Sequence, residues 1–198
     1  IYGCLNMGDI TANSFIGGIC GNTAQSTQIS NCFNSGSVTG KEQIGGIAGI
    51  NLNYITFCIN TGELTGEKKV YAVSHSDNVN GNENARIANS YYNSDVFSPA
   101  GDDNEVTGIS TGALCGSIFN DENIWESGSI TPDGSGKAQM TYVRLKNIPE
   151  TPAAMECDVF NFGTESEPDW DTYTLITEAQ QFVDIGADKA KWNQNYVL

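Results

Sequence analysis

The sequence has little basic charge and only one histidine. Nine Lys and Arg residues stand against 24 Asp and Glu, so the formal net charge is −15 and the isoelectric point is near 4.1. Proteins that bind nucleic acid need a basic surface for the phosphates, so this balance argues against that class of partner. The lone histidine, His75, leaves no HExxH motif and no Cys/His spacing typical of zinc.

Long hydrophobic runs are also lacking. No apolar stretch approaches the roughly 20 residues of a membrane-spanning helix. What is abundant is glycine (22) and asparagine (21), which together make up more than a fifth of the 198 residues. Both are poor helix formers that favour turns, so a helical bundle is not expected. A hydrophobic content of 39% argues against a chain that is disordered throughout.

The acidity and the glycine and asparagine content have different origins along the chain. Residues 1–98 hold 7 acidic and 4 basic residues, whereas residues 99–198 hold 17 and 5. The two halves are therefore interpreted separately.

A repeat occupies the first half. The segment 29–49 (ISNCFNSGSVTGKEQIGGIAG) matches residues 1–21 at a shift of 28 and residues 55–75 at a shift of 26, and a degenerate fourth copy spans 87–95. The matched columns are Ile1/Ile29/Ile55/Ile87, Cys4/Cys32/Cys58/Ser90, Leu5/Phe33/Ile59/Tyr91, Asn6/Asn34/Asn60, Gly8/Gly36/Gly62, Ile10/Val38/Leu64, Thr11/Thr39/Thr65, Ile16/Ile44/Val70 and Ile19/Ile47/Val73. Internal repeats of this length indicate a stacked architecture.

The period and composition predict a parallel β-solenoid. Each copy has three short apolar stretches between turn residues, which suits one coil of three strands, with successive coils about 4.8 Å apart. Aliphatic columns are expected to point inward, and the asparagine column to stack at a turn in the left-handed conformation. Gly8, Gly36 and Gly62 are interpreted as positive-φ residues. The pairs 17–18 and 45–46 are interpreted likewise, or as sites of close backbone approach.

The pattern I-x-N-C-F-N-S-G-x-V-T-G followed by G-G-I-A-G resembles the GLUG repeat of bacterial secreted and surface proteins. That repeat also occurs beside the peptidase in proteins of the IgA-specific metallopeptidase group. The resemblance covers about residues 1–95, and NSYYNS (89–94) and TGISTGALCG (107–116) are similar to segments that close such blocks. It implies a right-handed β-helix and an extracellular or cell-surface setting, and it implies no chemistry.

The rest of the chain is divided by composition. Residues 1–95 form the β-helix, 96–126 a capping loop with a short helix over 112–119, and 127–170 an acidic linker with one short strand. MTYVRLKNI (140–148) alternates as a strand does. Residues 171–198 predict a helix from Thr177 and then a strand, giving a small α/β segment that resembles the start of a further β-helix block. We expect a fragment of a longer polypeptide; the alternative is a complete protein whose last helix caps its own solenoid.

The six cysteines favour thiols over disulfides. Cys4, Cys32 and Cys58 share one inward column, and Cys20 aligns with a small residue, Ala48. Cys115 and Cys157 remain a candidate pair.

No catalytic, metal or cofactor residue is assigned. A triad would need His75, which is expected to be a solvated loop residue, and the neighbouring acids (102–103, 121–122, 169 and 171) lie in loops. Calcium is left open at 77–84 (DNVNGNEN) and 102–105 (DDNE), because oxygen ligands are abundant there.

The expected function is a non-catalytic structural or interaction module of a large secreted or surface protein of bacteria, such as an adhesin-like stalk. Its partners would be other domains of the same polypeptide and a host or neighbouring-cell protein or glycan. The alternative is a carbohydrate-binding or carbohydrate-active β-helix. That alternative requires an exposed row of aromatics, for which Tyr54, Tyr71, Tyr91 and Tyr92 are the candidates.

Overall fold

The computed structural model describes residues 1–76, 86–99, 106–115, 119, 121, 123–132 and 137–150, together with the strands at 153–161, 170–172, 174–175 and 196–197. These residues are all-β apart from one short helix, α1 (Thr111–Cys115). The chain divides into two compact units, residues 1–128 with 142–152 and residues 129–141 with 153–198. None of the described helical residues forms a segment long and apolar enough to cross a membrane.

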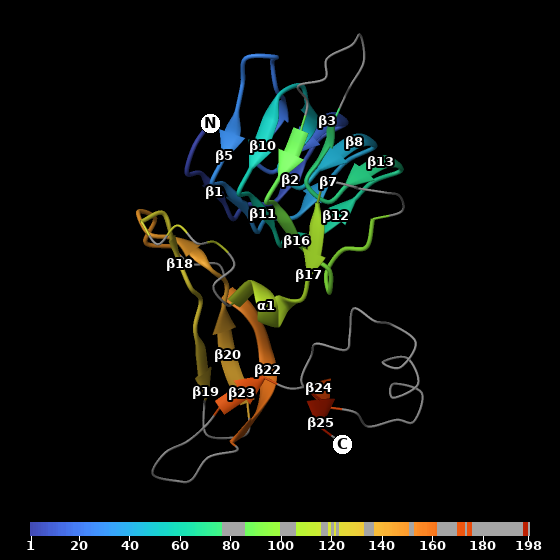
Figure 1. The fold of residues 1–198 in the computed structure, drawn as a ribbon. Helices are drawn as coiled ribbons and strands as arrows, with labels where there is room; N and C mark the ends of the chain where they lie inside the picture. The colour runs from blue at the N-terminus through green and yellow to red at the C-terminus, as the bar shows by residue number, and fades with distance from the viewer. Residues whose placement is uncertain are drawn as a thin grey trace. The chain divides into compact units, whose positions relative to one another are not determined.

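The repeat region of the first unit is built from five parallel sheets, to which successive copies of the repeat contribute successive strands (Figure 1). The largest is β1 (Leu5–Asn6), β6 (Phe33–Asn34), β11 (Ile59–Asn60), β16 (Tyr91–Asn93) and β17 (Thr107–Ile109) in that order. The others are β5 (Ile29–Ser30), β10 (Tyr54–Thr56), β15 (Arg86–Ala88); β2 (Ile10–Thr11), β7 (Val38–Thr39), β12 (Leu64–Thr65); β3 (Ser14–Gly17), β8 (Glu42–Gly45), β13 (Lys68–Tyr71); and β4 (Cys20–Asn22), β9 (Ala48–Asn51), β14 (Ser74–Ser76).

The strand register is that of the repeat columns. Phe33 pairs with Leu5 on one side and with Ile59 on the other, and Ile55 pairs with both Ile29 and Ile87. The all-β class and the parallel pairing are thus confirmed. The second copy forms five short strands rather than three stretches, because turns and left-handed residues interrupt the chain every few positions.

Two apolar clusters make the interior of the repeat region. One contains Ile29, Cys32, Ile47, Ala48, Ile55, Cys58, Val73 and Ile87, and the other contains Ile16, Val38, Ile44 and Leu64. Both clusters are assembled from equivalent positions of different copies, so no single copy buries its apolar side chains alone.

One apolar column faces the other way. Successive strand residues point to opposite sides of a sheet, and Asn34 lies against the backbone of Gly18 while Phe33 packs against Tyr142. Phe33 and Ile59 are nevertheless fully buried, because the later segments of the chain cover the outside of this sheet. The expectation that every aliphatic column points inward was wrong for this column.

The segment after the repeats packs against the two clusters. Phe97 adds to the cluster of Ile44, and Val106 adds to the cluster of Ile55. Helix α1 follows, with Ser110 as its N-cap: the Ser110 Oγ accepts from the Ala113 N–H at 3.3 Å. The sequence placed this helix at 112–119. The described helix covers Thr111–Cys115, and residues 116–118 lie outside the described residues.

Strands β18 (Trp125–Glu126) and β21 (Arg144–Leu145) pair antiparallel within the first unit. The second unit has an antiparallel sheet of β19 (Ile130–Pro132), β20 (Lys137–Thr141), β22 (Ala153–Asn161) and β23 (Trp170–Thr172), and a parallel pair of β24 (Thr174–Leu175) and β25 (Tyr196–Val197).

The segment expected to be a linker with one strand, 127–170, therefore contributes several paired strands, and the run 140–148 is split between β20 and β21. Proline and acidic residues argued against strands locally, and pairing between distant segments overrides that preference. The helix expected from Thr177 lies outside the described residues.

Candidate functional site

The asparagine column forms a ladder of side-chain amides between copies. The Asn6 Nδ2 donates to the Asn34 Oδ1 at 2.7 Å, and the Asn34 Nδ2 donates to the Asn60 Oδ1 at 2.8 Å. Each amide also donates to the carbonyl of the glycine two residues later, as Asn34 does to Gly36 at 2.9 Å. Asn34 and Asn60 are fully buried, so these bonds satisfy polar groups that would otherwise lose their contact with water.

The column of cysteines repeats one hydrogen bond. Each side chain donates to the carbonyl two residues earlier: Cys32 Sγ to Ser30 O at 3.2 Å and Cys58 Sγ to Thr56 O at 3.3 Å. Ser90 makes the same bond to Ala88 O at 3.1 Å, which explains why serine replaces cysteine in the fourth copy. Cys4, Cys20, Cys32 and Cys58 are free thiols. Cys115 is a buried thiol as well, so the candidate disulfide with Cys157 is not found in the structure.

The residue before each member of the cysteine column is left-handed. These residues are Gly3, Asn31, Phe57 and Asn89, with φ of 62°, 52°, 55° and 47°. A second left-handed column holds Phe15, Gln43 and Lys69. The turn at the first column aims the thiol back at the carbonyl. The predicted left-handed asparagines, Asn6, Asn34 and Asn60, have no positive φ, so that explanation of the asparagine column was wrong.

The glycine column serves close packing rather than backbone conformation. Gly3 is the only glycine with positive φ among the described residues. A Cβ on Gly36 would lie 2.1 Å from the Gly8 carbonyl oxygen, and one on Gly62 would lie 2.0 Å from that of Gly36. The positive-φ interpretation of Gly8, Gly36 and Gly62 was therefore wrong: the backbones of adjacent copies touch there. The pairs 17–18 and 45–46 are also sites of close approach, which was the alternative interpretation.

Burial raises the pKa of the Cys58 thiol well above its ordinary value, and burial together with the neighbouring Cys32 raises the pKa of Cys4. Because the folded pKa of Cys58 is raised, its contribution to stability is complete below the unfolded thiol pKa of about 8.5 and is lost as the pH rises towards the folded value.

We therefore expect the melting temperature of the protein to fall at alkaline pH more steeply than that of Cys58→Ser. Thermal unfolding followed by circular dichroism between pH 7 and pH 10.5 checks this. Groups that do not contact residue 58 are the same in both proteins and cancel in the difference. Parallel curves would contradict a thiol held neutral by burial.

An aromatic cluster covers the outside of the first left-handed column. Phe119 contacts Phe57, Tyr91 and Trp125, with ring centroids 5.8, 5.4 and 4.7 Å away. The Trp125 Nε1 donates to the Asn31 Oδ1 at 2.9 Å. Residues far apart in sequence thereby attach the segment around Trp125 to the second and third copies.

Trp125→Phe is expected to destabilise the first unit by about 1–2 kcal/mol, because it leaves the buried Asn31 Oδ1 without its donor. Chemical denaturation measures the change. Asn31→Gly keeps the left-handed backbone and removes the acceptor, so Trp125→Phe should cost less in that background. Equal costs in both backgrounds would show that the hydrogen bond contributes nothing.

A buried polar network lies at the fourth copy. The Asn93 Nδ2 donates to the Thr111 Oγ1 and to the Tyr142 OH, each at 2.9 Å. The Asp95 carboxylate accepts from the Thr111 N–H at 2.8 Å. The network joins β16 to residues of α1 and to Tyr142, and it thereby positions segments that follow the repeat.

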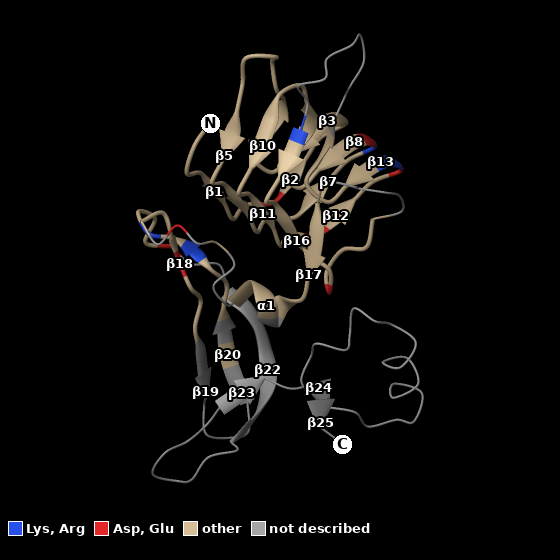
Figure 2. Cartoon of the chain, viewed as in Figure 1, with Lys and Arg blue, Asp and Glu red and all other residues tan. Residues whose placement is uncertain are grey.

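Charges are sparse on the described strands of the repeats, where they gather mainly at β8 and β13, and a second group lies around β18 (Figure 2). There Lys69 Nζ lies 3.7 Å from Glu42 Oε1. Asp9 accepts from the Ser37 hydroxyl and N–H at 2.7 and 3.0 Å, which lowers the pKa of its carboxyl group. Each of these carboxylates therefore has a structural partner.

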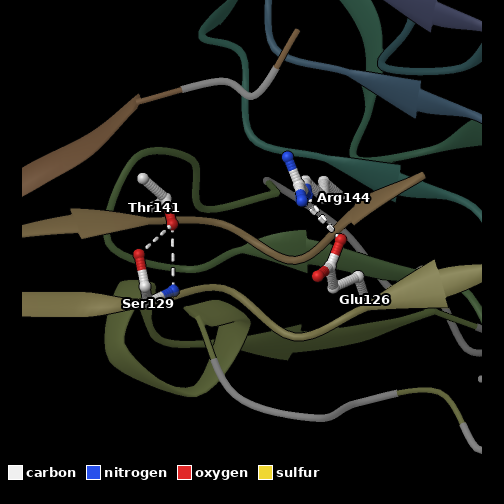
Figure 3. Close-up of polar contacts among 4 residues, drawn as sticks. All are labelled: Glu126, Ser129, Thr141 and Arg144. Carbon is white, nitrogen blue, oxygen red and sulfur yellow. Dashed lines mark hydrogen bonds and ion pairs between the residues drawn. The ribbon is translucent and has the colours of Figure 1, made fainter. Parts of the chain in front are cut away.

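Polar contacts outside the repeats are shown in Figure 3. Within the first unit, Arg144 Nη2 lies 2.6 Å from Glu126 Oε2 across β18 and β21. Within the second, the Thr141 Oγ1 accepts from the Ser129 N–H at 2.9 Å. Both contacts involve partly exposed residues. The first joins β18 to β21, and the second joins the end of β20 to the residue before β19.

The residues considered for chemistry do not form a described cluster. His75 lies in β14, half-buried, with its ring stacked on Tyr71 at 4.7 Å, so it is not the solvated loop residue expected. No group of three His, Cys, Asp or Glu among the described residues is placed to hold a metal ion. Both calcium candidates, 77–84 and 102–105, lie outside those residues, as do Glu122 and Asp169.

The four candidate tyrosines do not form one exposed row. Tyr91 packs against Phe119, and Tyr92 packs against Phe97 at 6.3 Å. Tyr54 is 37% exposed and belongs to β10, whereas Tyr71 belongs to β13 in another sheet. This arrangement does not favour the carbohydrate-binding alternative.

No family model, curated protein or solved structure matches the chain. The fold class is all-β with parallel sheets.

Proposed function

We propose that residues 1–95 form a right-handed parallel β-helix that acts as a non-catalytic structural or interaction module. The observation that carries this proposal is the register: equivalent residues of successive copies pair in parallel in five separate sheets. A chain whose successive copies pair side by side in the same sheets is stacked, and stacked repeats make rigid rods whose length grows with copy number.

The side chains most typical of the repeat support a structural role. The asparagines bond to each other, the thiols bond to backbone carbonyls, and the glycines allow close contact between copies. These groups are used within the molecule. Among the four tyrosines considered for carbohydrate binding, the most exposed is Tyr54, which pairs in register with Arg86.

The proposed setting is a large secreted or surface protein of bacteria, with the module as a spacer or adhesin-like stalk. The resemblance of the columns to GLUG repeats supports it, and so does the acidic sequence. Its partners would be neighbouring domains of the same polypeptide, and a protein or glycan on a facing cell.

The test is a glycan array combined with an activity screen on acidic polysaccharides. A spacer gives no saturable glycan binding and no turnover. Binding or cleavage that is lost in Tyr54→Ala, with an unchanged melting temperature, would instead establish the carbohydrate-active alternative and overturn the proposal. Lys69→Ala, on a different sheet, is the matched surface control.

A further inference from the structure

Three thiols lie one beside another in the cysteine column. Cys4, Cys32 and Cys58 belong to successive copies whose backbones pair in register here: the Phe33 N–H donates to the Cys4 carbonyl at 2.8 Å, and the Ile59 N–H donates to the Cys32 carbonyl at 3.0 Å. Paired strands are about 4.8 Å apart, and a disulfide needs Cα atoms roughly 4.4–6.8 Å apart. Each neighbouring pair of the column is therefore within reach of a crosslink.

The three side chains share one orientation. Each thiol donates to the carbonyl two residues earlier, with Sγ–O distances of 3.5 Å at Cys4, 3.2 Å at Cys32 and 3.3 Å at Cys58. Equal bonds at equivalent positions align the sulfur atoms along the column, with Cys32 between the other two. Cys4 and Cys58 are about twice the strand spacing apart, which exceeds the roughly 7 Å that a disulfide can span.

The middle thiol is the best nucleophile of the column. Hydrogen bonding to the Cys58 side chain lowers the pKa of the Cys32 thiol to about 7, against the opposing effect of burial, and hydrogen bonds with Cys4 lower it further. Either neighbouring thiol can turn from its carbonyl to donate to a thiolate at Cys32. Because the thiolate is the reactive form, Cys32 is suited to react first, with a second thiol waiting on each side.

Cys20 provides a comparison within the same repeats. It pairs in register with Ala48, which pairs in turn with Ser74, so its neighbours in its own sheet are not cysteines. The main column ends differently, because the Cys58 N–H donates to the hydroxyl of Ser90 at 3.2 Å. The run of three adjacent thiols is thus confined to one column of the described residues.

We propose that Cys32 is a site of reversible oxidation, at which a disulfide forms with either Cys4 or Cys58. Hydrogen peroxide is the oxidant, since it is small enough to reach a buried thiol when neighbouring copies separate briefly. The Cys32 thiolate attacks one peroxide oxygen, the O–O bond breaks, hydroxide leaves, and Cys32 becomes a sulfenic acid. The thiol of Cys4 or Cys58 then attacks the Cys32 sulfur, and the S–O bond breaks as the S–S bond forms.

The step balances without a further reactant. Two protein thiols lose two electrons and two protons in all, and one peroxide is reduced to two molecules of water. The crosslink joins residues 28 or 26 positions apart and ties two neighbouring copies together, which restricts the unfolded chain. This goes beyond the spacer role proposed above and does not depend on it, because the in-register pairing and the thiol positions are features of the structure itself.

Disulfide mapping of the full chain after peroxide treatment and alkylation tests the proposal. Digestion with trypsin and endoproteinase Asp-N places Cys4, Cys32 and Cys58 on residues 1–8, 9–41 and 42–68. Peroxide should join 9–41 to 1–8 in some molecules and to 42–68 in others, and dithiothreitol should remove both crosslinks. Cys20→Ser is the matched control: it removes the other cysteine of 9–41 and should leave both crosslinks in place.

Serine variants then separate the thiols, and serine suits the column because Ser90 already makes the native bond there. Cys4→Ser should leave only the crosslink to 42–68, and Cys58→Ser only the crosslink to 1–8. Cys32→Ser should give neither, although both outer thiols remain. With both outer thiols replaced, Cys32 should accumulate as a sulfenic acid that dimedone traps.

Three results would overturn the proposal. One is a folded protein whose column thiols stay uncrosslinked under peroxide concentrations that crosslink the urea-unfolded chain. Another is a crosslink that persists in Cys32→Ser, which would join the two outer thiols against the spacing of the column. The third is a crosslink to 9–41 that disappears in Cys20→Ser, which would assign the reaction to Cys20.

Discussion

Gly36→Ala is expected to destabilise the first unit by about 3 kcal/mol, in the range of severe overpacking, and to lower its melting temperature by about 10 °C. The new Cβ would lie 2.1 Å from the Gly8 carbonyl oxygen and 2.6 Å from its carbon. Those atoms are backbone, held by the same parallel pairing that positions Asn6 and Asn34, so they cannot move aside without breaking the ladder.

Gly8→Ala is the matched control, because it makes the same chemical change in the same column without a backbone atom in its way. Neither glycine has a positive φ, so torsional strain contributes to neither variant. Thermal and urea unfolding of both proteins measure the difference. Similar melting temperatures for the two variants would show that the copies do not pack as closely as the glycine column indicates.

The repeat columns predicted the strand register because stacking forces equivalent residues into contact. The same columns did not reveal the role of each glycine. Glycine is selected both where φ is positive and where two backbones touch, and the sequence is identical in the two cases. Gly8, Gly36 and Gly62 belong to the second case, which only the positions of neighbouring copies could show.

The left-handed positions were missed for a related reason. The residue before the cysteine column is Gly3, Asn31, Phe57 or Asn89. Glycine and asparagine favour the left-handed conformation and phenylalanine does not, so the column as a whole did not indicate it. Phe57 accepts this uncommon backbone while its ring packs against Phe119. That contact joins residues 62 positions apart, and no local pattern records it.

The second half was least predictable because its pairing is not periodic. Strand β22 pairs with β20 and β23, with no repeated motif to align them. Tyr142 and Trp125 likewise become core residues through partners far away in the sequence, among them Phe33 and Asn31 of the repeats. Their composition predicted an acidic linker. The segments are acidic, but they also form several paired strands, which composition did not predict.

Cys32→Asp is expected to unfold the first unit at neutral pH. The side chain of Cys32 is fully buried between Cys4 and Cys58 and donates to the Ser30 carbonyl. A carboxylate there would be buried among apolar side chains and would face a carbonyl oxygen instead of donating to it, at a cost of about 3–5 kcal/mol or more.

Cys32→Ser is the control for this variant. Ser90 already occupies the column and donates to Ala88 O, so a hydroxyl at residue 32 can make the native bond and should cost about 1 kcal/mol. The aspartate should also recover stability as the pH falls, because a buried carboxyl group has a raised pKa and its protonated form can donate to Ser30 O. Melting curves of both variants between pH 4 and pH 7 test this. A cooperative transition of Cys32→Asp near the wild-type temperature at pH 7 would contradict the inward thiol column, since only a solvated side chain tolerates that charge.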